Sequence, residues 1–250
     1  MRTEAPPAPP VPAAGRWRRL VSVGFVVILI SGVGIRAYND LSRPEAWAYW
    51  KDQYFSPSMT SSLIASADPA GSGAGRVALL VSGAIGPAAA SWFRGKLDEA
   101  HLAAGDTVLL SSSGGDLNQA IIMGEIIRSR GLVTAVGIAD GSSHIGPSYC
   151  ASACVLVYAG GTTRLGIEGS VLGVHRFVTS ATPAPGRDPV ADTQQTTAMI
   201  LGYMARMGVS SAVVQAMSET REIRWLGARE ASAMNLITAP IGTPKAPAPR

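Results

Sequence analysis

The sequence predicts an α/β fold with a mostly parallel sheet, preceded by a single N-terminal transmembrane helix. Two observations support this fold class. After residue 75, short apolar runs alternate with longer segments whose apolar residues recur at helical spacing, which is typical of right-handed βαβ units. Near the N-terminus, segment 20–35 carries no charge and lies between Arg19 and Arg36.

The same periodicity predicts the individual elements in order. We expect strands at 77–81, 107–110, 133–138, 163–167 and 171–174, helices at 87–103, 117–127, 152–158 and 191–207, and loops at 139–148 and 178–190. The chain then divides into a disordered basic tail (1–19), a transmembrane signal anchor (20–37), an aromatic helix with a flexible linker (38–75), a folded domain (76–240) and a disordered tail (241–250).

The apolar run is slightly shorter than the roughly 17–25 residues of a transmembrane helix, but Trp17 and Tyr38 can extend it to both interfaces. A cleaved signal peptide has the same order of features; the absence of an A-x-A-like cleavage site after the run favours an uncleaved anchor. Basic residues before a span keep the N-terminus in the cytoplasm, so we expect the domain outside it. The aromatic segment 44–55 either packs on the domain, which we prefer, or lies on the membrane surface.

Charge and composition exclude several classes of function. Segment 1–19 holds four arginines and one glutamate, or +3 of the net charge of +4, so the rest of the chain carries only +1 and offers no basic surface for nucleic acid. Two cysteines and three histidines, without an HExxH or paired CxxC motif, predict no metal site and no cofactor. An apolar content of 47% excludes a disordered protein.

Three short segments can carry chemistry. Glycines in segment 113–116, at a strand-to-helix turn, let backbone N–H groups point at a ligand, although such glycines often serve only the turn. Ser152 lies among small residues where a helix opens, and is either a nucleophile or a helix N-cap. His175 ends a predicted strand, where a lone histidine is more often structural.

In this order and spacing, the three segments resemble the Clp protease proteolytic subunit and its relatives in the ClpP/crotonase superfamily. The matching features are a Ser-Gly-Gly turn at 113–115, Ala-Ser-Ala at 151–153, and Val-His at 174–175, with 23 positions between serine and histidine. The resemblance continues through Ala-Gly-Gly at 159–161, Arg164 and Leu-Gly-Ala-Arg-Glu-Ala at 226–231, and covers about 76–240. It implies repeated ββα units, and it is nearest to membrane-anchored or periplasmic bacterial members.

The resemblance also implies roles. Ser152 would be the nucleophile and His175 the general base, and the backbone N–H groups of Gly114 and Ala153 would form the oxyanion hole. The implied reaction is peptide-bond hydrolysis through an acyl-enzyme, on a peptide or protein substrate. The implied assembly is a homo-oligomer, held in the bacterial inner membrane by residues 20–37 with its domain in the periplasm.

The sequence departs from the family at the third catalytic position, where Ile223 stands in place of an aspartate. Glu222 is the first candidate to assist His175, and Glu219 is also near; otherwise the site is a Ser–His dyad or is inactive. His144, in the loop before Ser152, is interpreted as a loop residue with a small chance of a catalytic role.

Cys150 and Cys154 flank Ser152 and either form a disulfide in an oxidising compartment or are two small buried apolar residues. Two other functions remain open. A catalytically inactive scaffold or peptide-binding protein is suggested by Ile223. A crotonase-type acyl-CoA enzyme shares the fold and the paired amides, but it needs neither this serine nor the histidine downstream.

Overall fold

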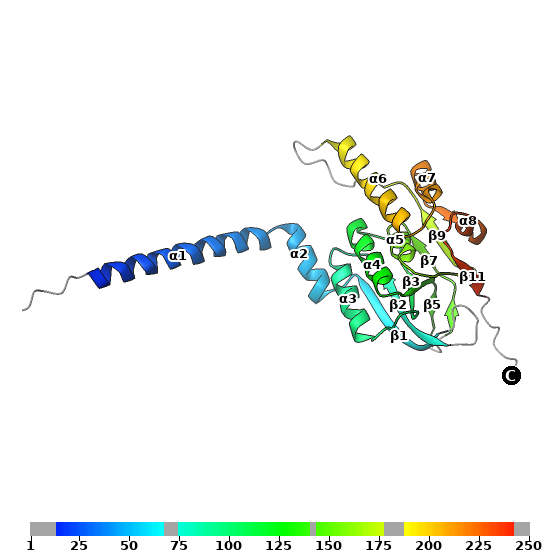
Figure 1. Cartoon of the computed structure of the whole chain (residues 1–250), viewed down its shortest axis with the longest axis horizontal. Helices are drawn as coiled ribbons and strands as arrows, with labels where there is room; N and C mark the ends of the chain where they lie inside the picture. Colours follow the sequence, from blue (N-terminus) through cyan, green and yellow to red (C-terminus); the bar gives the residue numbers. More distant parts are fainter. Residues whose placement is uncertain (1–13, 68–74, 141–143, 178–187, 243–250) are drawn as a thin grey trace, which may run out of the picture. The chain divides into compact units, whose positions relative to one another are not determined.

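The computed structural model describes residues 14–67, 75–140, 144–177 and 188–242 (Figure 1). The chain divides into two compact units, Met1–Ala48 and Tyr49–Arg250. Most of the predicted N-terminal tail, the centre of the predicted linker and most of the C-terminal tail lie outside the described residues, at 1–13, 68–74 and 243–250.

The first unit consists mainly of helix α1 (Ala14–Leu41), whose described side chains are exposed. The prediction of disorder up to residue 19 is wrong for 14–19, because alanine and arginine favour helix and extend the one that the apolar run forms. By length and composition, Leu20–Leu41 is apolar enough to cross a membrane, with a mean hydropathy of 2.2. It begins where the predicted anchor begins and ends one turn later.

The aromatic segment after α1 is helical, as predicted. Helix α2 (Pro44–Trp50) opens on a proline, which suits a first turn, and continues into a π-helical turn, η1 (Lys51–Phe55). The buried Asp52 carboxylate of η1 accepts hydrogen bonds from the N–H groups of Ser58 at 2.8 Å and Ala88 at 3.0 Å. Asp52 therefore fixes η1 to the residues just before the first strand and the third helix.

In the described residues, the main sheet has six strands in the order β1-β2-β3-β4-β8-β11. Neighbours from β2 to β11 pair in parallel, and β1 pairs antiparallel with β2, which confirms a mostly parallel sheet. The bounds are β1 (Met59–Ala67), β2 (Arg76–Gly83), β3 (Thr107–Ser111), β4 (Val133–Val136), β8 (Arg164–Ile167) and β11 (Ala239–Gly242).

Both outer strands of this sheet correct the sequence prediction. β1 lies within 38–75, where only a helix and a linker were expected, and β11 extends into the predicted tail at 241–242. The predicted strand 133–138 also ends early, and Ile138 belongs to a hairpin of β5 (Ile138–Ala139) and β6 (Ile145–Gly146) inside the predicted loop. Outer strands pair on one side only, so their sequences need less apolar character.

Alternation along the central strands divides their side chains between two clusters. On one face, Leu79 and Val108 join the main core with helices α3 (Ala89–Glu99), α4 (Leu117–Ser129) and α5 (Cys154–Ala159). All six residues of α5 are buried. On the other face, Leu80 and Leu109 pack with Ile145 of the hairpin in a smaller cluster.

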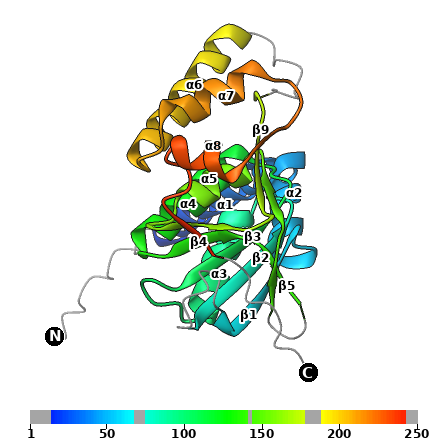
Figure 2. The ribbon, with the colours of Figure 1, turned by 90° about the vertical axis from the view of Figure 1, so that its right-hand side faces the viewer.

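A second, smaller sheet contains the two strands that lead directly to Ser152 and His175. Its order is β10-β9-β7, with β7 (Tyr149–Ala151) parallel and β10 (Arg224–Leu226) antiparallel to β9 (Val171–Val174). Helices α6 (Pro189–Arg206) and α7 (Ser211–Glu219) lie side by side beyond β9, and α8 (Ala228–Ala233) follows β10 (Figure 2).

The buried Arg164 joins the carboxyl ends of three helices. Its guanidinium and Nε donate to backbone carbonyls that follow or end α5, α6 and α8, namely those of Ala159, Gly161, Met207, Asn235 and Leu236, at 2.7–3.4 Å. Helix carboxyl ends carry partial negative charge, so one cation satisfies several otherwise unpaired acceptors. Burial lowers the pKa of Arg164, and the nearby Arg128 lowers it further, but an arginine stays protonated in a protein.

Candidate active site

Ser152 occupies a strained turn between β7 and α5. Its φ of 57° lies in the left-handed region. For a residue with a Cβ, this backbone conformation costs roughly 1–2 kcal/mol. Its N–H donates to the carbonyl of Gly173 at 2.8 Å, and its own carbonyl accepts from Val155 at 3.1 Å. The interpretation of Ser152 as a helix cap is wrong, because the N-cap residue of α5 is Ala153, which makes no side-chain cap bond.

The turn presents the Ser152 hydroxyl to His175. His175 follows directly after β9, and its Nε2 lies 2.8 Å from Ser152 Oγ. The second ring nitrogen, Nδ1, lies 2.8 Å from the backbone carbonyl oxygen of Arg176. A carbonyl only accepts, so Nδ1 carries the proton in the neutral ring and Nε2 is left as the acceptor for the serine O–H. This is the tautomer that a general base needs.

The Ser-Gly-Gly turn after β3 packs directly against the serine. Gly114 has a φ of 96°, and a Cβ there would lie 2.7 Å from both Ala151 O and Ser152 Cβ. Both the backbone conformation and the space therefore require glycine. The turn is also paired with Ile85, whose N–H donates to the carbonyl of Gly114 and whose carbonyl accepts from Asp116, each at 2.8 Å.

The amides around this turn differ in their partners. The N–H of Gly114 donates to the buried hydroxyl of Ser112 at 3.1 Å, so it is already engaged. Within the described parts of the chain, the N–H groups of Gly115 and Ala153 have no hydrogen-bond acceptor. These two amides, in the turns that contain Gly114 and Ser152, are therefore candidate donors to a ligand.

Among the described residues, no carboxylate makes a hydrogen bond or ion pair with His175. The pairing of β10 with β9 ends with Arg224 opposite Val174, and Ile223, just before β10, lies beside Gly173. Glu222 is exposed and, among the described residues, makes no side-chain hydrogen bond or ion pair. Ile223, which stands where the resemblance implies an aspartate, offers no acceptor to Nδ1.

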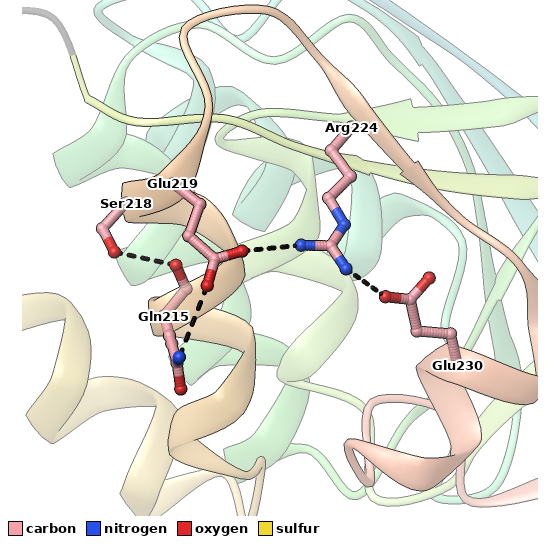
Figure 3. Close-up of polar contacts among 5 residues, drawn as sticks. All are labelled: Gln215, Ser218, Glu219, Arg224 and Glu230. Atoms are coloured by element: carbon pink, nitrogen blue, oxygen red, sulfur yellow. Dashed lines mark hydrogen bonds and ion pairs between the residues drawn. The ribbon is translucent and has the colours of Figure 1, made fainter.

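Glu219, the other nearby carboxylate, is held elsewhere. Figure 3 shows it between Gln215 and Arg224, with the Arg224 guanidinium at 2.9 Å. Arg224 also binds Glu230 of α8 at 2.7 Å, so it links the end of α7 to the start of α8. This network fixes β10, which begins directly after Ile223, and leaves Glu219 engaged with a cation.

Comparison with known proteins identifies the fold. No protein-family model matches the sequence, and no curated protein matches it. A variant of ClpP1 from Listeria monocytogenes matches the structure with a TM-score of 0.50 and 15% identity, covering 66% of this chain and 90% of that one. A variant of the 1510-N membrane-bound stomatin-specific protease matches with a TM-score of 0.50 and 15% identity, covering 65% of this chain and 77% of that one.

The protein has a ClpP-like fold. At this identity the likeness establishes the fold and leaves the chemistry to the residues themselves. The predicted resemblance to the ClpP/crotonase superfamily is confirmed at that level.

A cavity that the sequence analysis missed lies beside Arg176 and Phe177, the two residues that follow His175. It encloses about 190 Å³ between the residues after β9 and helices α6 and α7. Its lining includes Arg176, Phe177, Thr196, Ile200, Val214 and Met217. Apolar residues at helical spacing in α6 and α7 were a signal for packing, but the sequence does not show that the two helices leave space between them.

The remaining predicted site residues are placed as follows. Cys150 and Cys154 are joined by a disulfide across the Ser152 turn. His144 is exposed just before β6, and its backbone N–H donates to the Asp140 carboxylate at 2.9 Å. It makes no hydrogen bond to Ser152, whose hydroxyl contacts His175. In the parts of the chain that the structure describes, no three His, Cys, Asp or Glu side chains are grouped to hold a metal ion.

Proposed function

We propose that the protein is a membrane-anchored serine peptidase that hydrolyses peptide bonds through an acyl-enzyme. The observation that carries the proposal is the 2.8 Å contact between Ser152 Oγ and His175 Nε2 on a left-handed turn at the start of a buried helix. A serine hydroxyl is a weak nucleophile without a positioned base, so this contact is the feature that a structural serine would not need.

The proposed reaction follows from the positions of these groups. His175 Nε2 takes the hydroxyl proton as Ser152 Oγ attacks the substrate carbonyl carbon. The tetrahedral oxyanion accepts hydrogen bonds from the N–H groups of Ala153 and Gly115, the latter in place of the predicted Gly114, whose amide is engaged by Ser112. His175 then gives its proton to the leaving amine, and water repeats the sequence to release the acid and restore the serine.

The Arg176 carbonyl takes the orienting role that an aspartate has in a triad. It fixes the ring and its tautomer, but a neutral oxygen stabilises the imidazolium less than a carboxylate does. We therefore expect a working Ser–His dyad with a slower proton-transfer step. The cavity beside Arg176 and Phe177, which is mostly apolar, would receive an apolar side chain of the peptide.

Replacing Ile223 with aspartate should raise kcat on the order of tenfold, because a charge-assisted bond would replace a neutral one at His175 Nδ1. Glu222→Gln is the matched control and should leave kcat unchanged, since the exposed Glu222 makes no hydrogen bond to His175. Steady-state hydrolysis of a fluorogenic peptide measures both. A large loss in Glu222→Gln, with no gain in Ile223→Asp, would restore Glu222 as the third catalytic residue.

We further propose that α1 anchors the protein in the bacterial inner membrane, with its N-terminus in the cytoplasm and the domain in the periplasm. The apolar segment Leu20–Leu41, the arginines before it, and the disulfide, which persists in oxidising compartments, support this arrangement. One of the structural neighbours is itself described as membrane-bound. The ClpP-like fold also supports self-association into a homo-oligomer around a peptide or protein substrate.

A reporter enzyme fused after Arg250 tests the topology. A reporter that is active only after export should be active, and one that is active only in the cytoplasm should be silent. A control fusion that lacks residues 1–37 should reverse both results. Cytoplasmic activity of the full-length fusion would contradict the proposed side of the membrane.

A catalytically inactive, peptide-binding scaffold is the second candidate, because Ile223 stands where a carboxylate would complete a triad. The two functions differ in turnover. A peptide library incubated with the purified full-length protein should yield new N-termini if the protein is a peptidase, and should be bound without cleavage if it is a scaffold.

A further inference from the structure

The disulfide between Cys150 and Cys154 surrounds the proposed nucleophile symmetrically. Cys150 is in β7 and Cys154 is the first residue of α5, with Ser152 midway between them. The two Cα atoms are 5.3 Å apart, and both half-cystines are buried in the main core at 0% and 1% exposure. The bridge thus ties the last part of a strand to the first turn of a helix at the point where the chain reverses.

The turn that the bridge spans needs support. A left-handed serine persists only where the surrounding structure determines its conformation. Three hydrogen bonds hold the backbone of the turn: Ala151 N–H to Ser112 O at 3.0 Å, Ser152 N–H to Gly173 O, and Val155 N–H to Ser152 O. The disulfide is the covalent restraint within this set.

The position of the bridge indicates a local effect. A disulfide restrains the unfolded chain more strongly when it closes a longer loop, and this one closes a loop of only five residues, 150–154. Its contribution to global stability through the unfolded chain is therefore small for a disulfide. The same shortness makes it well placed to restrict the backbone angles of Ser152.

We propose that Cys150 and Cys154 are positioning residues, whose bridge holds Ser152 in its left-handed conformation with Oγ directed at His175. The inference rests on the proposed nucleophilic role of Ser152. Without the bridge, the turn relaxes toward conformations in which Oγ and Nε2 separate. A displacement of about 1 Å in a catalytic group lowers turnover on the order of a hundredfold, so we expect acylation to slow by about 10- to 100-fold.

The test compares Cys150→Ala, Cys154→Ala and the double variant with the wild type in the full-length protein. The second-order rate of labelling by a fluorophosphonate should fall equally in all three, because either substitution removes the whole bridge. In peptide hydrolysis, kcat should fall while KM stays unchanged. Ile127→Val, which removes a methylene from a fully buried residue of α4, is the control for loss of core packing and should label at the wild-type rate.

Two outcomes would overturn the inference: variants that label as fast as the wild type, or single variants whose effects add in the double variant, which would indicate separate packing roles. Hydrogen exchange of the peptide containing residues 151–156 provides a readout that is independent of activity. Exchange should rise there in the cysteine variants and not in Ile127→Val. If the wild type never labels, the proposed function fails, and unchanged exchange at 151–156 would then also overturn the positioning role.

Discussion

Replacing Ser152 with alanine should lower peptide turnover by at least about a thousandfold, leaving only the residual catalysis that substrate binding and the oxyanion-hole amides provide. The substitution removes Oγ, the only atom of Ser152 that contacts His175 through a side-chain hydrogen bond. It leaves the left-handed backbone as it is, because alanine and serine both carry a Cβ. The measurement is hydrolysis of a fluorogenic peptide by the purified full-length protein, with circular dichroism to verify the fold.

Stability should change little in the same variant, since Ser152 does not cap α5. His175→Ala should produce a loss of similar size, and the double variant should lose no more than either single variant, because the two residues act as one unit. Normal turnover in Ser152→Ala, or effects that multiply in the double variant, would contradict the shared role of the pair.

Replacing Arg164 with methionine should destabilise the domain by about 3–5 kcal/mol, the usual effect of breaking a buried charged network. Methionine fills similar space but donates no hydrogen bond. The carbonyls after α5, α6 and α8 would then be left buried without the donor they share. Arg128 reaches only two of the acceptors, Ala159 and Met207, and cannot replace the rest.

The matched control for Arg164 is Arg206→Met. Arg206 is an exposed arginine whose ion pair with Glu125, at 2.9 Å, lies in solvent, so its loss should change the free energy of unfolding by no more than about 1 kcal/mol. Urea unfolding followed by circular dichroism measures both variants. Equal, small effects in the two would show that the carbonyls around Arg164 find other donors.

The sequence predicted the central strands well and the outer ones poorly, for a physical reason. β2 and β3 are buried on both faces and are therefore nearly continuous apolar runs. β1 contains threonine and several serines and buries only some of its side chains, and β11 contains a proline, which an outer strand tolerates. Neither sequence therefore has the apolar pattern by which a strand is recognised.

In the candidate site, the roles of side chains could be predicted from the sequence, but the roles of main-chain groups could not. The family resemblance of the ordered motifs implied that Ser152 and His175 meet, which they do at 2.8 Å. The group that orients His175 could not be predicted, because it is the backbone carbonyl of Arg176, and every residue has one. The engaged amide of Gly114 likewise depends on the rotamer of Ser112, which the sequence does not specify.

The nucleophilic role of Ser152, activated by His175, is best tested by locating the site of covalent labelling. The full-length protein is treated with a fluorophosphonate, digested and mapped by mass spectrometry. We expect one phosphonyl adduct, on Ser152, that is lost in Ser152→Ala and strongly reduced in His175→Ala. A folded wild-type protein that acquires no adduct at Ser152 across pH and in the presence of peptide would contradict the nucleophilic role.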